Sequence, residues 1–210
     1  MGRRYDLVIF DCDGVLFDSR EANHRYYDFI ATRLGRSLLT REELDYVHMH
    51  TAEESLRFMF RDSPHLVERA LELAAEVGYD PFLSYMEREP GMEETIERLR
   101  AAGVKTAIST NRSTTMPRLR EIFRLDPLFD AIVSALDVEH PKPHPQGVEM
   151  ILYRLGIPRE KAVYVGDSQV DEETAVNSGL PLIAYKNRAL KGLRYVDSFP
   201  EIGEIVLAAP

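Results

Sequence analysis

The sequence lacks several features that would assign a protein to a class at once. It has one cysteine, Cys12, so it can form no internal disulfide and has too few thiols for a zinc cluster. Its longest apolar stretches, such as 7–10, have the length of a strand, and no apolar core follows the arginines near the N-terminus. We therefore expect a cytoplasmic protein with neither a membrane span nor a signal peptide.

Positive charge is scarce as well. Lysine and arginine number 26 against 35 aspartates and glutamates, which gives a net charge of −9, and no run of basic residues occurs. Because an acidic surface repels phosphate backbones, nucleic acid is not an expected partner. At 210 residues, 44% hydrophobic and 29% charged, the chain fits one globular domain or one domain with an insertion.

From residue 91 onward, short apolar runs alternate with helical patterns. This alternation is typical of an α/β fold with a Rossmann-like parallel sheet that carries helices on both faces. The run 5–10 supplies one more buried strand. We predict strands at 5–10, 104–109, 131–134, 161–165 and 181–184, and helices at 92–102, 115–124, 145–155, 171–178 and 198–209.

Residues 16–90 have a different character. Apolar residues recur there at spacings of three and four, without a convincing strand, and the pattern predicts helices at 20–34, 40–47, 51–60, 64–77 and 80–88. The first strand is thus separated from the rest of its sheet by an insertion. We predict a core domain of 1–15 and 91–210, and an inserted α-helical domain of 16–90, joined through hinges at 17–19 and 89–91.

The residues best suited to chemistry lie in loops of the predicted core. In an open parallel sheet, ligands bind outside the carboxyl ends of the strands. Carboxylates, a hydroxyl and an amine that converge there from separate loops would form a site for a hard cation and a phosphate group. The candidates are Asp11, Asp13, Thr110, Asn111, Lys142, Asp167 and Asp171.

Their chemistry suits phosphoryl transfer. Mg²⁺ prefers oxygen ligands and needs one or two carboxylates beside a substrate phosphate, for which Asp11 and Asp167 are the natural pair. A carboxylate can attack phosphorus and form an aspartyl-phosphate when cations such as Mg²⁺ and Lys142 cancel the repulsion. Asp13 can protonate the leaving oxygen and later deprotonate the attacking water, and Thr110 can bind the transferred oxygens.

Four segments resemble, in order, the motifs of the haloacid dehalogenase superfamily of phosphohydrolases. They are 11–16 (Asp-Cys-Asp-Gly-Val-Leu), 109–111 (Ser-Thr-Asn), 142–143 (Lys-Pro) and 166–171 (Gly-Asp-Ser-Gln-Val-Asp). Each motif alone is weak, whereas four in this order are highly specific. The resemblance implies that 16–90 is the type-1 helical cap of this family, which closes over the site and selects the substrate.

The resemblance also implies a role for each matching residue. Asp11 would be the nucleophile and Asp13 the acid and base, while Lys142, together with Thr110, would bind phosphate. Mg²⁺ would be held by Asp11, by the main-chain carbonyl of Asp13 and by Asp167. Asp171 would support the ion directly or through water.

Simpler interpretations stay open for some positions. Residues 110–111 could cap the helix that follows, and Asp171 could be an acid favoured by a helix dipole. Cys12 is expected to point away from the flanking aspartates as a buried structural thiol. His48 and His50, in the insertion, could reach a substrate. The candidate substrate ligands are therefore Thr110, Asn111, Lys142, His48 and His50.

Branches of the family differ in a few characteristic residues, and the residues of this sequence at those positions favour some branches over others. Asp13 favours a phosphate substrate over an organic halide, and the absence of any lysine before Lys105 disfavours phosphonate cleavage through a cap Schiff base. The sugar-phosphate mutases resemble this chain, but they use a lysine, a glycine and an arginine in the cap. The matching positions here are His48, Met49 and Ala52, which disfavours mutase activity. Arg112 likewise stands where they place a lysine.

The sequence thus resembles the phosphoglycolate phosphatase and β-phosphoglucomutase-like branch. We expect an Mg²⁺-dependent phosphomonoester hydrolase that acts on a small phosphorylated metabolite. The alternatives are a phosphotransferase, a sugar-phosphate mutase, or a non-catalytic module that binds a phosphorylated ligand. The sequence leaves monomer and homodimer equally open.

Overall fold

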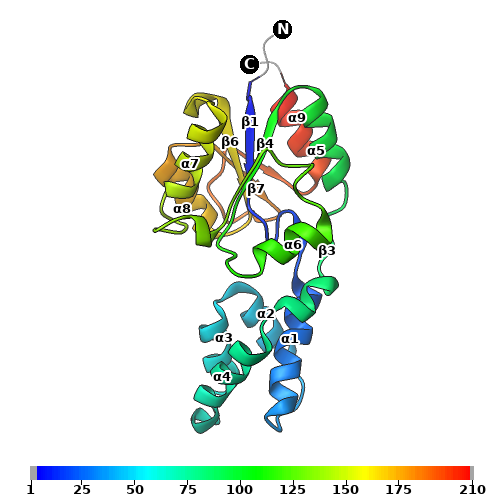
Figure 1. The fold of residues 1–210 in the computed structure, drawn as a ribbon, viewed down its shortest axis with the longest axis vertical. Coiled ribbons are helices and arrows are strands. Elements are labelled where there is room, and N and C mark those ends of the chain that lie inside the picture. The colour runs from blue at the N-terminus through cyan, green and yellow to red at the C-terminus, as the bar shows by residue number, and fades with distance from the viewer. Residues whose placement is uncertain (1–3, 209–210) are drawn as a thin grey trace. The chain divides into compact units, whose positions relative to one another are not determined.

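The computed structural model describes residues 4–208 and divides into two compact units (Figure 1). One unit comprises the chain up to Phe17 and from Arg88 onward, and the other comprises Asp18–Glu87. Among the described residues, no helix is both long enough and apolar enough to cross a bilayer.

The first unit is built on a sheet of six parallel strands, in the order β5-β4-β1-β6-β7-β8. The central strand β1 pairs with β4 on one side and with β6 on the other. Strands β1 and β6 are buried along their whole length, as expected for a parallel sheet covered on both faces. The strands are β1 (Leu7–Phe10), β4 (Lys105–Ser109), β5 (Ala131–Val133), β6 (Ala162–Gly166), β7 (Leu182–Tyr185) and β8 (Arg194–Val196).

Five helices accompany this sheet, and Figure 1 shows α5 and α9 on one side of it, with α7 and α8 on the other. Side chains alternate along β1, so Leu7 and Ile9 join one core cluster while Phe10 stacks on Phe199 of α9 at 5.9 Å between ring centroids. The helices are α5 (Met92–Ala101), α6 (Met116–Phe123), α7 (Gln146–Leu155), α8 (Gln169–Ser178) and α9 (Phe199–Leu207).

The strand order makes the carboxyl ends of β1 and β6 the place where a ligand is expected. From β1 the next sheet strand, β4, lies on one side, whereas β6 lies on the other side of β1. In open α/β sheets, ligands bind outside the carboxyl ends of the strands where the strand order reverses in this way.

The second unit is helical, with a core that includes Tyr26, Ile30, Leu56 and Phe60. Thr40 and Thr51 begin two of its helices with reciprocal capping boxes. Its helices are α1 (Arg20–Arg33), α2 (Arg41–Met49), α3 (Ala52–Met59) and α4 (Val67–Val77), with 3₁₀ turns at Pro64–Leu66 and Asp80–Tyr85.

The α/β fold with inserted helices is confirmed, and some element predictions are wrong. The predicted helix 80–88 is a 3₁₀ helix followed by β3 (Glu87–Arg88), which pairs with β2 (Phe17–Asp18). Apolar residues three positions apart, such as Leu83 and Met86, fit a 3₁₀ helix as well as an α-helix. The apolar pattern therefore could not distinguish the two kinds of helix. Strand β8 was not predicted because its three residues form no apolar run. The predicted end of the last helix lies outside the described residues.

Candidate active site

Three carboxylates gather where β1 and β6 end. Asp11 follows β1 and its N–H donates to the carbonyl of Val165 in β6, with 2.9 Å between nitrogen and oxygen. Asp167 follows β6, and Asp171 lies in the first turn of α8. Asp11, Asp167 and Asp171 each offer an oxygen within 4.8 Å of the others. An all-oxygen donor set of this kind fits a hard divalent cation.

Asp171 is fixed by the start of α8. Ser168 is the N-cap residue: its hydroxyl accepts from the N–H of Asp171 and donates to Oδ2 of Asp171 at 2.6 Å. The N–H groups of Asp167 and Ser168 donate to the same oxygen at 3.2 and 3.1 Å. Asp171 is therefore an acid of the first helical turn that also lies in the carboxylate cluster, and its role in supporting a metal ion stays a prediction.

Two glycines let the carboxylates approach the backbone. A Cβ on Gly14, whose φ is +75°, would lie 2.0 Å from Oδ2 of Asp167. A Cβ on Gly166 would lie 2.2 Å from the Cβ of Asp171. Side chains at these two positions would displace the carboxylates.

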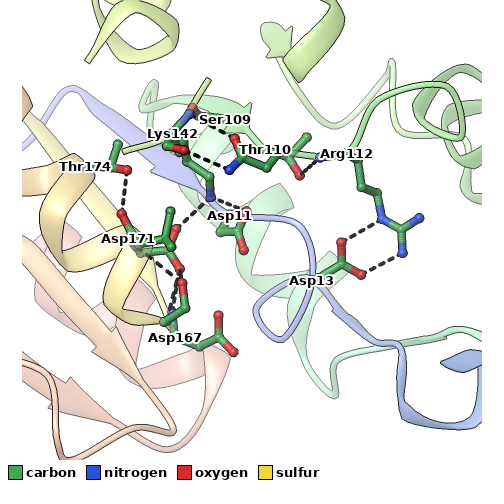
Figure 2. A network of polar contacts seen from close by, with 12 residues as sticks. Asp11, Asp13, Ser109, Thr110, Arg112, Lys142, Asp167, Asp171 and Thr174 are labelled. Atoms are coloured by element: carbon green, nitrogen blue, oxygen red, sulfur yellow. Dashed lines mark hydrogen bonds and ion pairs between the residues drawn. The ribbon is translucent and has the colours of Figure 1, made fainter. Parts of the chain in front are cut away.

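Lys142 lies among these carboxylates. Its Nζ donates to Oδ1 of Asp11 and to Oδ1 of Asp171 (Figure 2), in each case with 2.7 Å between nitrogen and oxygen. The phenol of Tyr164, fully buried in β6, is a third contact of Nζ at 3.2 Å and lies 3.1 Å from Asp171 Oδ1. Only 7% of the Lys142 side chain is exposed, so its ammonium group is bound by the groups of the site rather than by solvent.

Burial and mutual repulsion set the charge of the cluster. Burial, followed by the charge of Asp171, raises the pKa of Asp11 to about 7, although Lys142 opposes the shift. Burial, with repulsion from Asp11 and Asp171, raises the pKa of Asp167 to about 8. Burial also disfavours ionised Asp171, but Lys142 and Ser168 outweigh it and lower the pKa of that carboxyl. One ammonium thus faces three carboxylates, and a bound cation would favour the ionised forms.

The loop that carries Lys142 is tied to the loop after β4. Asn111 donates from Nδ2 to the carbonyl of Lys142 at 3.0 Å and accepts at Oδ1 from its N–H at 2.9 Å. These two hydrogen bonds of the Asn111 side chain are therefore with the protein backbone. Helix α6 begins after Thr115, so the alternative in which residues 110–111 cap this helix is wrong.

Asp13 lies apart from the carboxylate cluster and faces Arg112 (Figure 2). Nε and Nη2 of Arg112 each donate to one carboxylate oxygen of Asp13, both at 2.7 Å. The N–H of Arg112 donates to the hydroxyl of Thr110 at 3.1 Å, which links this pair to a candidate phosphate ligand. Thr110 is itself 4% exposed.

Two residues of this site were not predicted from the sequence. Arg112 follows Thr110 by two residues in the same loop, and this closeness to a candidate phosphate ligand could have identified it as a site residue. For Tyr164 the sequence offers a weaker indication, namely a side chain with a hydroxyl group inside an otherwise apolar run. The predicted burial of Cys12 is confirmed, since its side chain is fully buried, and burial raises the pKa of its thiol.

The two histidines belong to the helical unit. Nδ1 of His48 lies 3.3 Å from Nδ2 of Asn23. His50 is exposed and stacks on Tyr46 with ring centroids 3.7 Å apart. A contact of either histidine with substrate stays a prediction.

Comparison with known proteins agrees with this geometry. Residues 8–185 match the family described as haloacid dehalogenase-like hydrolase. The chain is 30% identical to a phosphoglycolate phosphatase of Rhodobacter capsulatus, over 85% of this chain and 83% of the relative. It is 29% identical to the pyrophosphatase PpaX of Halalkalibacterium halodurans, over 92% of this chain and 89% of the relative.

A solved structure is similar over nearly the whole chain. It is a haloacid dehalogenase superfamily hydrolase, subfamily IA, variant 1, from Geobacter sulfurreducens, with 35% identity, a TM-score of 0.89 and 98% of each chain covered. The chain therefore belongs to the haloacid dehalogenase-like hydrolases, in the subfamily IA branch that includes phosphatases.

Proposed function

We propose that the protein hydrolyses a small phosphorylated compound through an aspartyl-phosphate on Asp11, with Mg²⁺ as cofactor. The observation that carries this proposal is the contact of Lys142 Nζ with Asp11 Oδ1 at 2.7 Å, inside a cluster of three carboxylates. A carboxylate paired with a buried ammonium can accept a phosphoryl group whose charge the ammonium offsets.

Asp11 and Asp167 would hold the ion, as two of the three carboxylates that meet at this site, and Asp171 would support it directly or through water. By resemblance to the family, the main-chain carbonyl of Asp13 would be a further oxygen donor. When bound, Mg²⁺ would neutralise the transferring oxygens and reduce their repulsion from Asp11. The set fits because all its donors are oxygens and because burial leaves its negative charge poorly solvated.

The protein groups would carry the remaining chemistry. A carboxylate oxygen of Asp11 attacks phosphorus while the bond to the leaving oxygen breaks, and Asp13 gives that oxygen its proton. Water then attacks the same phosphorus, Asp13 takes a proton from it, and Asp11 is released as a carboxylate. Lys142 and Thr110, the latter through its hydroxyl, hold the transferred oxygens throughout.

The relatives named above support a small substrate, because one is called a pyrophosphatase and another a phosphoglycolate phosphatase. The helical unit carries six more acidic than basic residues over 14–90, 15 against 9, which disfavours large polyanions. We assign the helical insertion 16–90 the role of selecting the substrate, with His48 and His50 as its candidate contacts. Asn111, in the core unit, is a further candidate contact.

The test is phosphate release from a panel that includes pyrophosphate, phosphoglycolate and sugar phosphates, with Mg²⁺ or with chelator. Asp11→Asn should remove the release, whereas the matched control Asp126→Asn, at an exposed position of the same unit, should not. Phosphorylated acceptor or an isomerised sugar phosphate in place of free phosphate would indicate a transferase or a mutase. Binding without turnover would indicate a non-catalytic module.

A further inference from the structure

Arg112 and Asp13 form a two-pronged ion pair across 99 residues of sequence. The two bonds run from different guanidinium nitrogens to different carboxylate oxygens, both at 2.7 Å. This fork geometry fixes the plane of the carboxylate as well as its position, which a single lysine contact would not do. Of the Arg112 side chain 10% is exposed, against 38% for Asp13.

The guanidinium is itself held in place. Nη1 of Arg112 donates to the hydroxyl of Thr115 at 3.1 Å, and its main-chain carbonyl accepts from the N–H of Ala135 at 3.0 Å. With the bond from its N–H to Thr110, Arg112 is anchored at its main chain and at its side chain. The loop after β4 therefore sets where the Asp13 carboxylate lies.

The two cations of this site serve different carboxylates. Nζ of Lys142 contacts Asp11 and Asp171, whereas Nε and Nη2 of Arg112 contact Asp13 (Figure 2). Lys142 thus offsets the negative charge of Asp11 and Asp171, next to the position that a phosphoryl group would occupy. Arg112 instead contacts Asp13, the residue proposed to transfer the proton.

We propose that Arg112 is a positioning residue that orients Asp13 for proton transfer to the leaving oxygen and from the attacking water. The proposal rests on the proposed function, because it requires Asp13 to act as acid and base. Each carboxylate oxygen has two lone pairs and Arg112 uses one on each, so a second lone pair is left to carry the transferred proton. A general acid works only within hydrogen-bond reach of its target, so a carboxylate free to rotate would lose much of its effect.

The test compares phosphate esters that differ in how much their leaving group needs a proton. An alkyl phosphate needs protonation as its bond breaks, whereas p-nitrophenyl phosphate leaves readily as the anion. Both esters form the same phosphorylated Asp11, so the comparison uses kcat/KM, which covers the steps up to departure of the leaving group. Arg112→Gln should lower kcat/KM for the alkyl ester about 100-fold and for p-nitrophenyl phosphate less than about 10-fold. Asp13→Asn should give the same selective loss, and the double variant should lose little more than either single variant.

Two further variants sharpen the comparison. Arg112→Lys keeps the charge without the fork and should be intermediate between wild type and Arg112→Gln. Arg118→Gln is the matched control, since this exposed arginine pairs with Glu121 on the surface of α6, and it should change neither ester. Orthovanadate, as a phosphate analogue, should bind Arg112→Gln as it binds wild type if the phosphate site is intact.

Three outcomes would overturn the proposal. An equal loss for both esters would assign Arg112 a merely structural role. A rise in KM confined to substrates with an anionic leaving group would make it a substrate ligand. Full additivity in the double variant would show that it acts independently of Asp13. Failure of the proposed function itself is separate, because wild type would then release phosphate from neither ester.

Discussion

The side chain of Asn111 hydrogen-bonds both main-chain groups of Lys142, accepting from its N–H at 2.9 Å and donating to its carbonyl at 3.0 Å. The two residues are 31 positions apart and come from different loops. The pairing connects the end of β4 to the loop that delivers the Nζ of Lys142 to the carboxylates. The place of this ammonium therefore depends on an amide that is itself exposed.

Asn111→Ala removes both bonds and should loosen the Lys142 loop. We expect a fall in kcat of about 10-fold with a modest loss of stability of about 1 kcal/mol, because the lost bonds are partly replaced by water. Steady-state kinetics and thermal unfolding of the same preparation measure the two effects. Unchanged kinetics would show that the loop holds Lys142 without Asn111.

Gly14→Ala should weaken metal binding. The new Cβ would lie 2.0 Å from Asp167 Oδ2, and the backbone has a φ of +75°. We expect the apparent affinity for Mg²⁺ to fall at least about 10-fold as Asp167 is displaced. Gly35→Ala is the control, because Gly35 has a φ of +74° and no atom near its Cβ position. It should share the backbone strain and leave Mg²⁺ affinity unchanged.

Tyr164→Phe removes a hydroxyl without changing the volume of the core. The lost group contacts Lys142 Nζ at 3.2 Å and Asp171 Oδ1 at 3.1 Å. Leaving these charged groups with one partner fewer should lower the free energy of unfolding by about 1–2 kcal/mol and reduce kcat severalfold. Tyr153→Phe, at a residue 89% exposed, should change neither quantity. A Tyr164→Phe variant equal to wild type in both would assign this hydroxyl no role.

The raised pKa values predict how stability depends on pH without a divalent cation. Burial raises the pKa of Asp11 to about 7 and that of Asp167 to about 8, so the folded protein binds these protons more tightly than the unfolded chain. Their contribution to stability is complete below the ordinary pKa of aspartate and is lost as pH rises through about 7 and about 8.

Thermal unfolding at pH 5 and pH 9, in chelator, measures this effect. Asp167→Asn should reduce the decline in Tm toward high pH by about 5 °C, since it removes one of the two groups. Mg²⁺ should reverse the decline in wild type, because binding requires the ionised carboxylates and releases their protons. An identical pH profile in wild type and variant would contradict the shift assigned to Asp167.

Local patterns in the sequence were enough to predict the strands of the core sheet other than β8 and the carboxylates that follow β1 and β6. Apolar runs mark β1 and β6, and parallel strands bring Asp11 and Asp167 to one edge. The same reasoning did not find the pairing of Arg112 with Asp13 or the contacts of Tyr164. Those depend on the angle at which loops leave the sheet, which no short pattern encodes. The short strand β8 and the 3₁₀ turn at Asp80–Tyr85 are set by tertiary packing rather than by periodicity.

An aspartyl-phosphate on Asp11 can be detected directly. The protein would be mixed with a turned-over phosphate ester and Mg²⁺, quenched in acid within one turnover, and digested for mass analysis of the peptide that contains Asp11. We expect a phosphoryl modification at Asp11 that requires Mg²⁺ and disappears when substrate is exhausted. Turnover that persists in Asp11→Asn, or a modification found on another residue, would contradict it.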